Sequence, residues 1–152
     1  MGHRLTIAMQ SWRANVQWQG KKPSAVELTV SVDSLAVLSG EGGVTPLTPP
    51  ERIVARANAL KSLDAKKFPE IRFTSEQISA TSGGYRLEGT LEIHGVSRPQ
   101  TVDVTAEENG SRYAAEVTLR QSDFGVKPYS LMMGTLKVAD EVVVRFTGTH
   151  AA

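Results

Sequence analysis

Alternation of hydrophobic and polar residues is the strongest pattern along this chain. Seven stretches repeat it with a period of two residues, which is typical of β-strands with one buried and one solvated face. They cover residues 3–9, 12–18, 25–33, 85–93, 100–107, 113–120 and 142–148. Antiparallel strands of this kind bury their apolar face either by closing into a barrel or by packing as a sandwich, and the pattern allows both.

The parity of the alternation changes between the first two stretches. Met9 ends one apolar set and Trp12 begins the next, three positions later. A straight strand would turn the second set to the opposite face of the sheet. We therefore predict a bulge or bend at Gln10 and Ser11.

Residues 48–69 break the alternation and predict a helix. Thr48 followed by Glu51 has the spacing of a capping box, and Pro49 stands at the first helical position, where its missing N–H costs nothing. An apolar stripe with helical spacing should pack over one end or flank of the sheet; it consists of Ile53, Ala57 and Leu60. Pro69 closes the segment.

A long glycine-rich stretch, residues 38–50, precedes this helix. Its segment Ser39–Gly43 lacks the Lys-Ser/Thr pair of a phosphate-binding P-loop and does not open a helix directly, so we interpret this segment as a flexible loop. Long loops of this kind often serve as functional lids. A second turn is predicted at Asn109 and Gly110, because Asn-Gly tolerates the positive φ of a hairpin turn.

Length and composition limit the classes of function. A chain of 152 residues fits a single domain, residues 1–152, and it has no cysteine and a net charge of +1. Acidic and basic residues are interspersed, which argues against a nucleic-acid-binding surface. No apolar run reaches the ~20 residues of a membrane span, and the N-terminus lacks the pattern of a signal peptide. We expect a cytoplasmic protein that is not inserted in a membrane.

Candidate catalytic and metal-binding groups are sparse. The three histidines have no metal-ligand spacing, and no serine lies in a nucleophile elbow. His94 continues the polar face of its strand, so we expect it to point away from the apolar interior. Residues 95–98 should form a loop, with Pro99 starting the next strand. In the Ser-Asp-Phe-Gly sequence, we expect Asp123 to satisfy backbone donors in a turn.

The apolar face of the predicted strands leaves two alternatives, a packed core or the lining of a cavity. Trp12 and Trp18 share this face with Val16 and suit either one. Small residues on the same face weakly favour a cavity; they are Ala14, Gly89, Ala106 and Ala115.

Several segments resemble the bacterial YceI-like family. Residues 64–75, 89–99 and 120–125 match its sequence motifs in order, and Asp-Glu-Val at residues 140–142 matches its end. The resemblance covers residues 60–149. It implies an all-β, lipocalin-like antiparallel barrel of about eight strands with one helix packed against it, similar to polyisoprenoid-binding proteins. Some relatives in this family are periplasmic.

The resemblance implies a carrier of a long apolar lipid, such as a polyisoprenoid or isoprenoid quinone, and no catalytic residue, metal or other cofactor. The head group is expected near the glycine-rich loop and the helix. Alternation and resemblance together give the expected ligand-binding residues, which are Trp12, Val16, Trp18, Phe73, Leu87, Leu91, Val104, Val117 and Phe146. Two alternatives remain: a structural or stress-related protein whose barrel is filled by its own side chains, and an enzyme using His94, Arg120 or Asp123.

The N-terminal part resembles the family less. His3 stands where family members carry a histidine after a first strand, so we expect that strand to be missing from this chain. An uncovered strand edge invites association. We therefore expect either a homodimer or a shortened barrel covered by the helix. We also expect His94 and Arg98 to anchor neighbouring loops.

Overall fold

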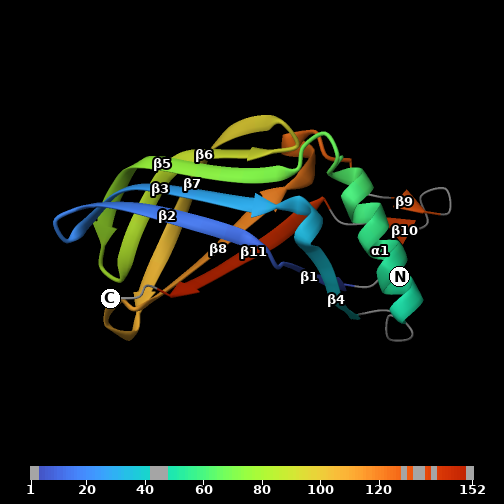
Figure 1. Cartoon of the computed structure of the whole chain (residues 1–152), viewed down its shortest axis with the longest axis horizontal. Coiled ribbons are helices and arrows are strands. Elements are labelled where there is room, and N and C mark those ends of the chain that lie inside the picture. The colour runs from blue at the N-terminus through green and yellow to red at the C-terminus, as the bar shows by residue number, and fades with distance from the viewer. Residues whose placement is uncertain (1–3, 42–47, 128–129, 132–135, 138–139, 150–152) are drawn as a thin grey trace.

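The computed structural model describes residues 4–41, 48–127, 130–131, 136–137 and 140–149. Its main feature is a seven-stranded antiparallel sheet in the order β11-β8-β7-β6-β5-β3-β2, curled into a half-barrel (Figure 1). The strands are β2 (Trp12–Gln19), β3 (Lys22–Ser31), β5 (Glu70–Thr81), β6 (Gly84–Ile93), β7 (Val96–Glu107), β8 (Arg112–Arg120) and β11 (Glu141–Thr149). The predicted all-β, lipocalin-like class with one helix is confirmed.

Smaller elements complete the chain. β1 (Arg4–Met9) pairs with β4 (Leu35–Glu41), and β9 (Ser130–Leu131) pairs with β10 (Leu136–Lys137). Three short 3₁₀ turns lie at strand ends: η1 (Val32–Ser34), η2 (Glu108–Gly110) and η3 (Gln121–Phe124). The predicted first family strand concerns residues before Arg4 and lies outside the described residues.

The predicted bend at Gln10 and Ser11 is confirmed. These two residues separate β1, which pairs with β4, from β2, which pairs with β3. Both residues are hydrogen-bonded through their backbone. The Gln10 N–H donates to the Ser34 carbonyl at 3.3 Å, and the Ser31 N–H donates to the Ser11 carbonyl at 3.0 Å. The change of parity therefore marks the transfer of the chain from one sheet to another.

The helix α1 (Pro49–Ser62) begins with the predicted capping box. The Glu51 N–H donates to the Thr48 hydroxyl at 3.3 Å, and the Thr48 N–H donates to the Glu51 carboxylate at 3.0 Å. The helix lies across one end of the half-barrel, next to β4 (Figure 1). Its position matches the expectation of a helix over one end of the sheet.

The predicted apolar stripe of α1 is a packing face only in part, because Leu60 is half-buried and the other two residues are not. Ile53 is 70% exposed, and Ala57 is exposed too. The helix instead turns half-buried small side chains such as Ala55 and Ala59 inward. Arg56 fixes the contact, because its guanidinium donates to the carbonyls of Leu35 at 2.8 Å and Asp33 at 2.6 Å. Hydrogen bonds from arginine side chains to backbone carbonyls therefore add to the contacts of half-buried side chains in docking this helix.

The turn between β6 and β7 is tighter than predicted. It consists of His94 and Gly95 alone, with φ of 56° and 73°, the two successive positive values of a type I′ turn. The predicted loop at residues 95–98 is therefore wrong, and Pro99 lies inside β7. Pro99 is tolerated there because this part of β7 does not pair with β8, so no bond of that ladder is lost.

The other two predicted loops are also partly strand or turn. The hairpin at Asn109 is confirmed, with a four-residue connection between the paired residues Glu107 and Arg112. Residues 38–41 of the predicted glycine-rich loop belong to β4, and residues 42–47 lie outside the described residues. In the described part of the chain, no helix has the length and apolar character needed to cross a membrane.

Buried apolar side chains gather in two places among the described residues. Phe73 and Leu87 lie in the middle of the sheet, on β5 and β6. The others lie where the 3₁₀ turns close the end of the half-barrel nearest α1; they are Val32, Leu35, Phe124 and Val126. The packed core therefore sits at one end and one side of the curled sheet.

Candidate functional site

The strand register places the nine predicted ligand-binding residues on one face of the sheet. Residues directly opposite each other in antiparallel strands share a face. Phe73 is opposite Leu91, and Phe146 is opposite Ala115, which is opposite Val104. By the same pairing, the other predicted residues are on this face too: Trp12, Val16, Trp18, Leu87 and Val117. We call this concave side of the half-barrel the inner face.

Solvent access to the inner face is graded across the sheet. Phe73 is 6% exposed and Leu87 is buried, whereas Trp12 is 44% exposed at the β2 edge. Val16, Trp18 and Val144 are also more than a third exposed. Large apolar side chains that remain accessible in this way typically mark an interaction site. The inner face is thus packed around β5 and β6 and open toward β2 and β11.

The two edge strands meet through an aromatic contact. The rings of Trp12 on β2 and Phe146 on β11 pack edge to face with centroids 5.0 Å apart. Gly148 leaves room for them, since a Cβ at this position would lie 3.0 Å from the Phe146 ring and 4.0 Å from Trp12. We call this contact the β2–β11 seam. It brings together strands that stand at opposite ends of the hydrogen-bonding order.

A small residue on the inner face does not always leave space. A Cβ at Gly89 would lie 2.9 Å from the Phe73 ring, so that ring occupies the position. Gly89 is required there by close packing between β5 and β6. The sequence analysis took Gly89 as weak support for a cavity, but in the structure it supports packing.

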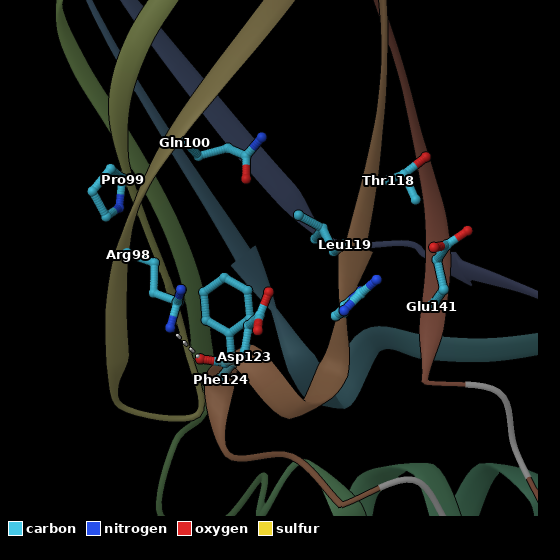
Figure 2. A pocket seen from close by; sticks show the side chains of 9 residues that line it. Arg98, Pro99, Gln100, Thr118, Leu119, Asp123, Phe124 and Glu141 are labelled. Carbon is cyan, nitrogen blue, oxygen red and sulfur yellow. Dashed lines mark hydrogen bonds between the residues drawn. The ribbon is translucent and has the colours of Figure 1, made fainter.

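The wall of the half-barrel is broken between β7 and β8. The two strands pair only through residues 104–107 and 112–115, and then they separate. A cavity of about 300 Å³ occupies the gap, at the end of the sheet near α1 (Figure 2). We call it the β7–β8 window; it is lined by Arg98, Pro99, Gln100, Thr118, Leu119, Arg120, Asp123, Phe124 and Glu141.

Residues from both faces of the sheet line the window. Arg98 is opposite Leu91 and Gln100 is opposite Gly89, so both are at inner-face positions. Leu119 is also on the inner face, opposite Val142, whereas Arg120 is opposite Glu141 on the outer face. The cavity therefore lies at the edge between the two faces, where β7 and β8 separate.

Arg98 and Gln100 were missed as site residues. The Arg98 guanidinium donates to the Asp123 carbonyl at 3.3 Å, and the Gln100 amide donates to the Thr101 carbonyl at 2.9 Å. The alternation of β7 carries the signal for both, because Gln100 and Arg98 continue the parity of Val102 toward the N-terminus. The predicted strand starts at Pro99 and therefore leaves out Arg98.

The predicted anchoring role of the His94–Arg98 segment is confirmed. His94 Nδ1 lies 3.2 Å from the Phe124 carbonyl, and its ring packs edge to face on Phe68 at 4.9 Å. Arg98 reaches the neighbouring carbonyl of Asp123. The β6–β7 turn is thus tied to η3 and to the segment that precedes β5.

The turn at η3 is capped by a different carboxylate from the predicted one. Asp140, not Asp123, binds its donors: the Ser122 hydroxyl at 2.6 Å and the Ser122 N–H at 2.7 Å. These bonds, led by the one from the hydroxyl, lower the pKa of the Asp140 carboxyl. The side chain of Asp123 is exposed at the window.

The three groups named for the enzyme alternative do not converge on the inner face. His94 is held in the β6–β7 turn, whereas Arg120, at an outer-face position, and Asp123, in η3, both line the β7–β8 window. Within the described ranges, no group of three or more His, Asp or Glu side chains has the arrangement of a metal site.

Comparisons with known proteins agree on the family. The YceI-like domain model matches residues 2–149. UPF0312 proteins of Pseudomonas putida strains W619 and GB-1 are each 30% identical over 122 residues, which is 74% of this chain. The chain spans 59% of the length of these curated relatives.

Solved structures show the same fold. BcnA of Burkholderia cenocepacia is 25% identical, with a TM-score of 0.69 over 94% of this chain and 87% of that chain. The YCEI protein of Campylobacter jejuni is 14% identical, with a TM-score of 0.63 over 98% of this chain and 86% of that chain. The sequence match and the shared half-barrel lead to one conclusion: the chain belongs to the YceI-like domain family.

Proposed function

We propose that this protein binds a long apolar lipid, of the polyisoprenoid or isoprenoid-quinone type, along its inner face and acts as a carrier. The observation that carries the proposal is the graded inner face, whose aromatic and aliphatic side chains stay accessible toward β2 and β11. A soluble protein rarely leaves a continuous apolar surface of this kind uncovered unless a partner occupies it. The family membership supports the same class of ligand.

The energetics suit a ligand that is mostly hydrocarbon. Each methylene group removed from water contributes about 0.8 kcal/mol, so ten of them contribute roughly 8 kcal/mol before the cost of ordering the chain. Few hydrogen bonds are then needed. The inner face matches this requirement, because its side chains on β2, β3 and β11 are almost all apolar.

A binding role is supported over a catalytic one by the arrangement of polar groups. Of the residues named for the enzyme alternative, His94 is held in a turn, and Arg120 and Asp123 line the β7–β8 window from an outer-face position and from η3, away from the apolar inner face. Catalysis on a bound apolar substrate needs acid, base or nucleophile side chains within hydrogen-bond reach of the reacting atoms.

Native mass spectrometry of the protein purified from cells tests the proposal, followed by lipid extraction. Two neighbouring valines on β11 provide a matched pair. Val144 is on the inner face and is 46% exposed, whereas Val143 is on the outer face and is 51% exposed. We expect Val144→Asp to lose the co-purified lipid, because it places a carboxylate against hydrocarbon, and Val143→Asp to retain it.

The result is decisive when both variants keep the thermal unfolding transition of the parent protein. Equal lipid content in the two variants would place the ligand away from the inner face. A parent protein that carries no lipid and does not bind an added C20 isoprenoid would favour the structural alternative, in which the barrel is filled by its own side chains.

A further inference from the structure

We propose that the protein docks on the surface of an anionic lipid bilayer through the outward side of helix α1. This inference goes beyond the carrier function and stands on different residues, because it concerns the side of the helix that faces away from β4. We call this side the α1 surface. It consists of five exposed residues: Pro50, Ile53, Val54, Ala57 and Lys61.

The α1 surface is apolar where a surface helix is normally polar. Its positions follow the i, i+3, i+4, i+7 spacing of one side of a helix, and all but the last are apolar. Ile53 is 70% exposed and Val54 is 55% exposed, the two largest values for big apolar side chains in the described part of the chain. Leu38 on the neighbouring β4 is 49% exposed. The helix therefore turns apolar side chains to solvent.

The docking of α1 explains how its apolar side can remain outside. Arg56 donates to the carbonyls of Asp33 and Leu35, and Arg52 donates to the Leu38 carbonyl at 3.4 Å. These bonds hold the helix against the start and middle of β4 without its most exposed aliphatic side chains. Those side chains are then available to contact another surface.

The charge of this segment favours an anionic partner. Residues 49–67 hold five basic and two acidic side chains, a net charge of +3; because the whole chain carries +1, the remaining residues carry −2. The hydrogen bonds of Arg52 and Arg56 go to uncharged carbonyls and do not cancel their charge. Lys61, Lys66 and Lys67 are exposed. Aliphatic side chains next to exposed lysines suit a helix that lies on anionic lipid head groups.

A second copy of the chain fits the α1 surface less well. In a twofold interface the same residues meet from both sides, so two segments with a net charge of +3 would face and repel each other. A bilayer instead offers hydrocarbon to the aliphatic side chains and phosphate groups to the lysines. The helix lies across one end of the half-barrel, so docking would bring that end to the bilayer (Figure 1).

Co-sedimentation with vesicles tests the inference. The anionic vesicles contain phosphatidylglycerol and phosphatidylethanolamine in equal parts, and the neutral vesicles contain phosphatidylcholine in place of phosphatidylglycerol. At low ionic strength we expect the protein to bind the anionic vesicles at least about tenfold more tightly than the neutral ones, because several basic side chains contribute. Raising the salt concentration should weaken this binding, because salt screens exposed charges.

Two double variants of the helix segment separate the aliphatic from the basic contribution. Ile53→Gln/Val54→Gln keeps good helix formers and removes the aliphatic contact, so binding to anionic vesicles should weaken by about tenfold. Lys61→Gln/Lys66→Gln should weaken it by about fivefold for each lysine removed. Both variants should keep the thermal unfolding transition of the parent protein, because the four side chains are exposed.

Matched controls remove the same kinds of side chain elsewhere. Val143→Gln replaces a valine on the outer face of β11 that is 51% exposed. Lys21→Gln/Lys22→Gln removes two exposed lysines from the hairpin between β2 and β3, at the opposite end of the molecule from α1 (Figure 1). Both controls should bind the anionic vesicles as the parent protein does.

The inference is overturned if the parent protein does not bind the anionic vesicles, or if the controls weaken binding as much as the helix variants. Self-association that Ile53→Gln/Val54→Gln abolishes, in a protein that ignores vesicles, would assign the α1 surface to a second copy. The lipid that co-purifies with the helix variants, measured by native mass spectrometry, should equal that of the parent protein. Vesicle docking and the proposed carrier function therefore succeed or fail separately.

Discussion

At the scale of single residues, the β6–β7 turn depends on Gly95. Its φ is 73°, and a Cβ there would lie 2.5 Å from the Phe68 ring, which also contacts His94. We expect Gly95→Ala to lower the free energy of unfolding by about 1–3 kcal/mol, through backbone strain and displacement of Phe68. Urea denaturation measures the change.

Gly83 provides the matched control for this prediction. It also lies in a two-residue turn, between β5 and β6, but nothing is within 4 Å of an added Cβ and its φ is not in the left-handed region. Gly83→Ala should change stability by less than about 1 kcal/mol. Equal losses in the two variants would mean that the Phe68 contact has no special role.

Asp140 gives the protein a pH-dependent contact at η3. Its folded-state pKa is lowered from the ordinary value of 3.8, so its contribution to stability is present above pH 3.8 and is lost as the pH falls through the lower folded-state value. We expect Asp140→Asn to be less stable than the parent protein at neutral pH and to show a flatter decline in stability below pH 4. Thermal unfolding between pH 2.5 and 7 measures both effects. A decline as steep as that of the parent protein would assign the acid sensitivity to other carboxylates.

At the scale of elements, Arg56 makes the two shortest hydrogen bonds that dock α1, and Arg52 adds one to the Leu38 carbonyl at 3.4 Å. Arg56 donates to two carbonyls, those of Asp33 and Leu35, at the start of β4. We expect Arg56→Ala to lower stability by about 1–2 kcal/mol, because these hydrogen bonds to a charged donor are lost. Hydrogen exchange should accelerate in α1 and β4 and stay unchanged in β5 and β6.

Lys61→Ala controls for the loss of a long basic side chain from the same helix. Lys61 is exposed in the last turn of α1. Its removal should leave the exchange of β4 as it is in the parent protein. If both variants accelerate exchange equally, helix propensity and net charge, rather than docking, explain the effect.

The sequence predicts elements well where one period is unbroken. The helix and its capping box follow from Thr48 and Glu51, and seven of the strands follow from alternation. β5 was not recognised from alternation, because a register shift between Ser75 and Gln77 moves its apolar positions by one. Alternation does not predict β4 either, and residues 38–41 of this strand fall in the predicted glycine-rich loop. The docking face of α1 was also missed, because stripes of apolar residues do not reveal docking through Arg56.

The same limit applies to the candidate site. Alternation predicts which residues share the inner face, because side-chain direction in a strand is a local property. The separation of β7 from β8 is a property of the pairing between distant strands, and nothing in the residues around Pro99 specifies it. Alternation can place Arg98 on the inner face, but its position beside the window follows only once the register is known.

At the scale of the whole molecule, the β2–β11 seam closes the half-barrel. We expect the Trp12–Phe146 contact to contribute a coupling of about 0.5–1.5 kcal/mol, the usual range for an edge-to-face aromatic pair. A double-mutant cycle with Trp12→Leu and Phe146→Leu, followed by urea denaturation, measures it. Trp18, six residues further along β2, should give an additive cycle with Phe146.

An absent coupling between Trp12 and Phe146 would mean that the edges of the sheet are held by other groups. The homodimer expected from an uncovered edge stays a prediction. Analytical ultracentrifugation over a range of protein concentrations tests it. A monomer at all concentrations would exclude the homodimer and would mean that the seam within one chain brings β2 and β11 together.

The seam has a kinetic consequence. β2 and β11 stand at opposite ends of the hydrogen-bonding order of the described strands and meet through side chains, so they can part without breaking a ladder between them. In the proposed carrier function, loading and unloading of the lipid would then need no local unfolding. The rate of exchange would depend on how readily two rings separate, and it could be tuned at Trp12 or Phe146 without changing the stability of β5, β6 and β7.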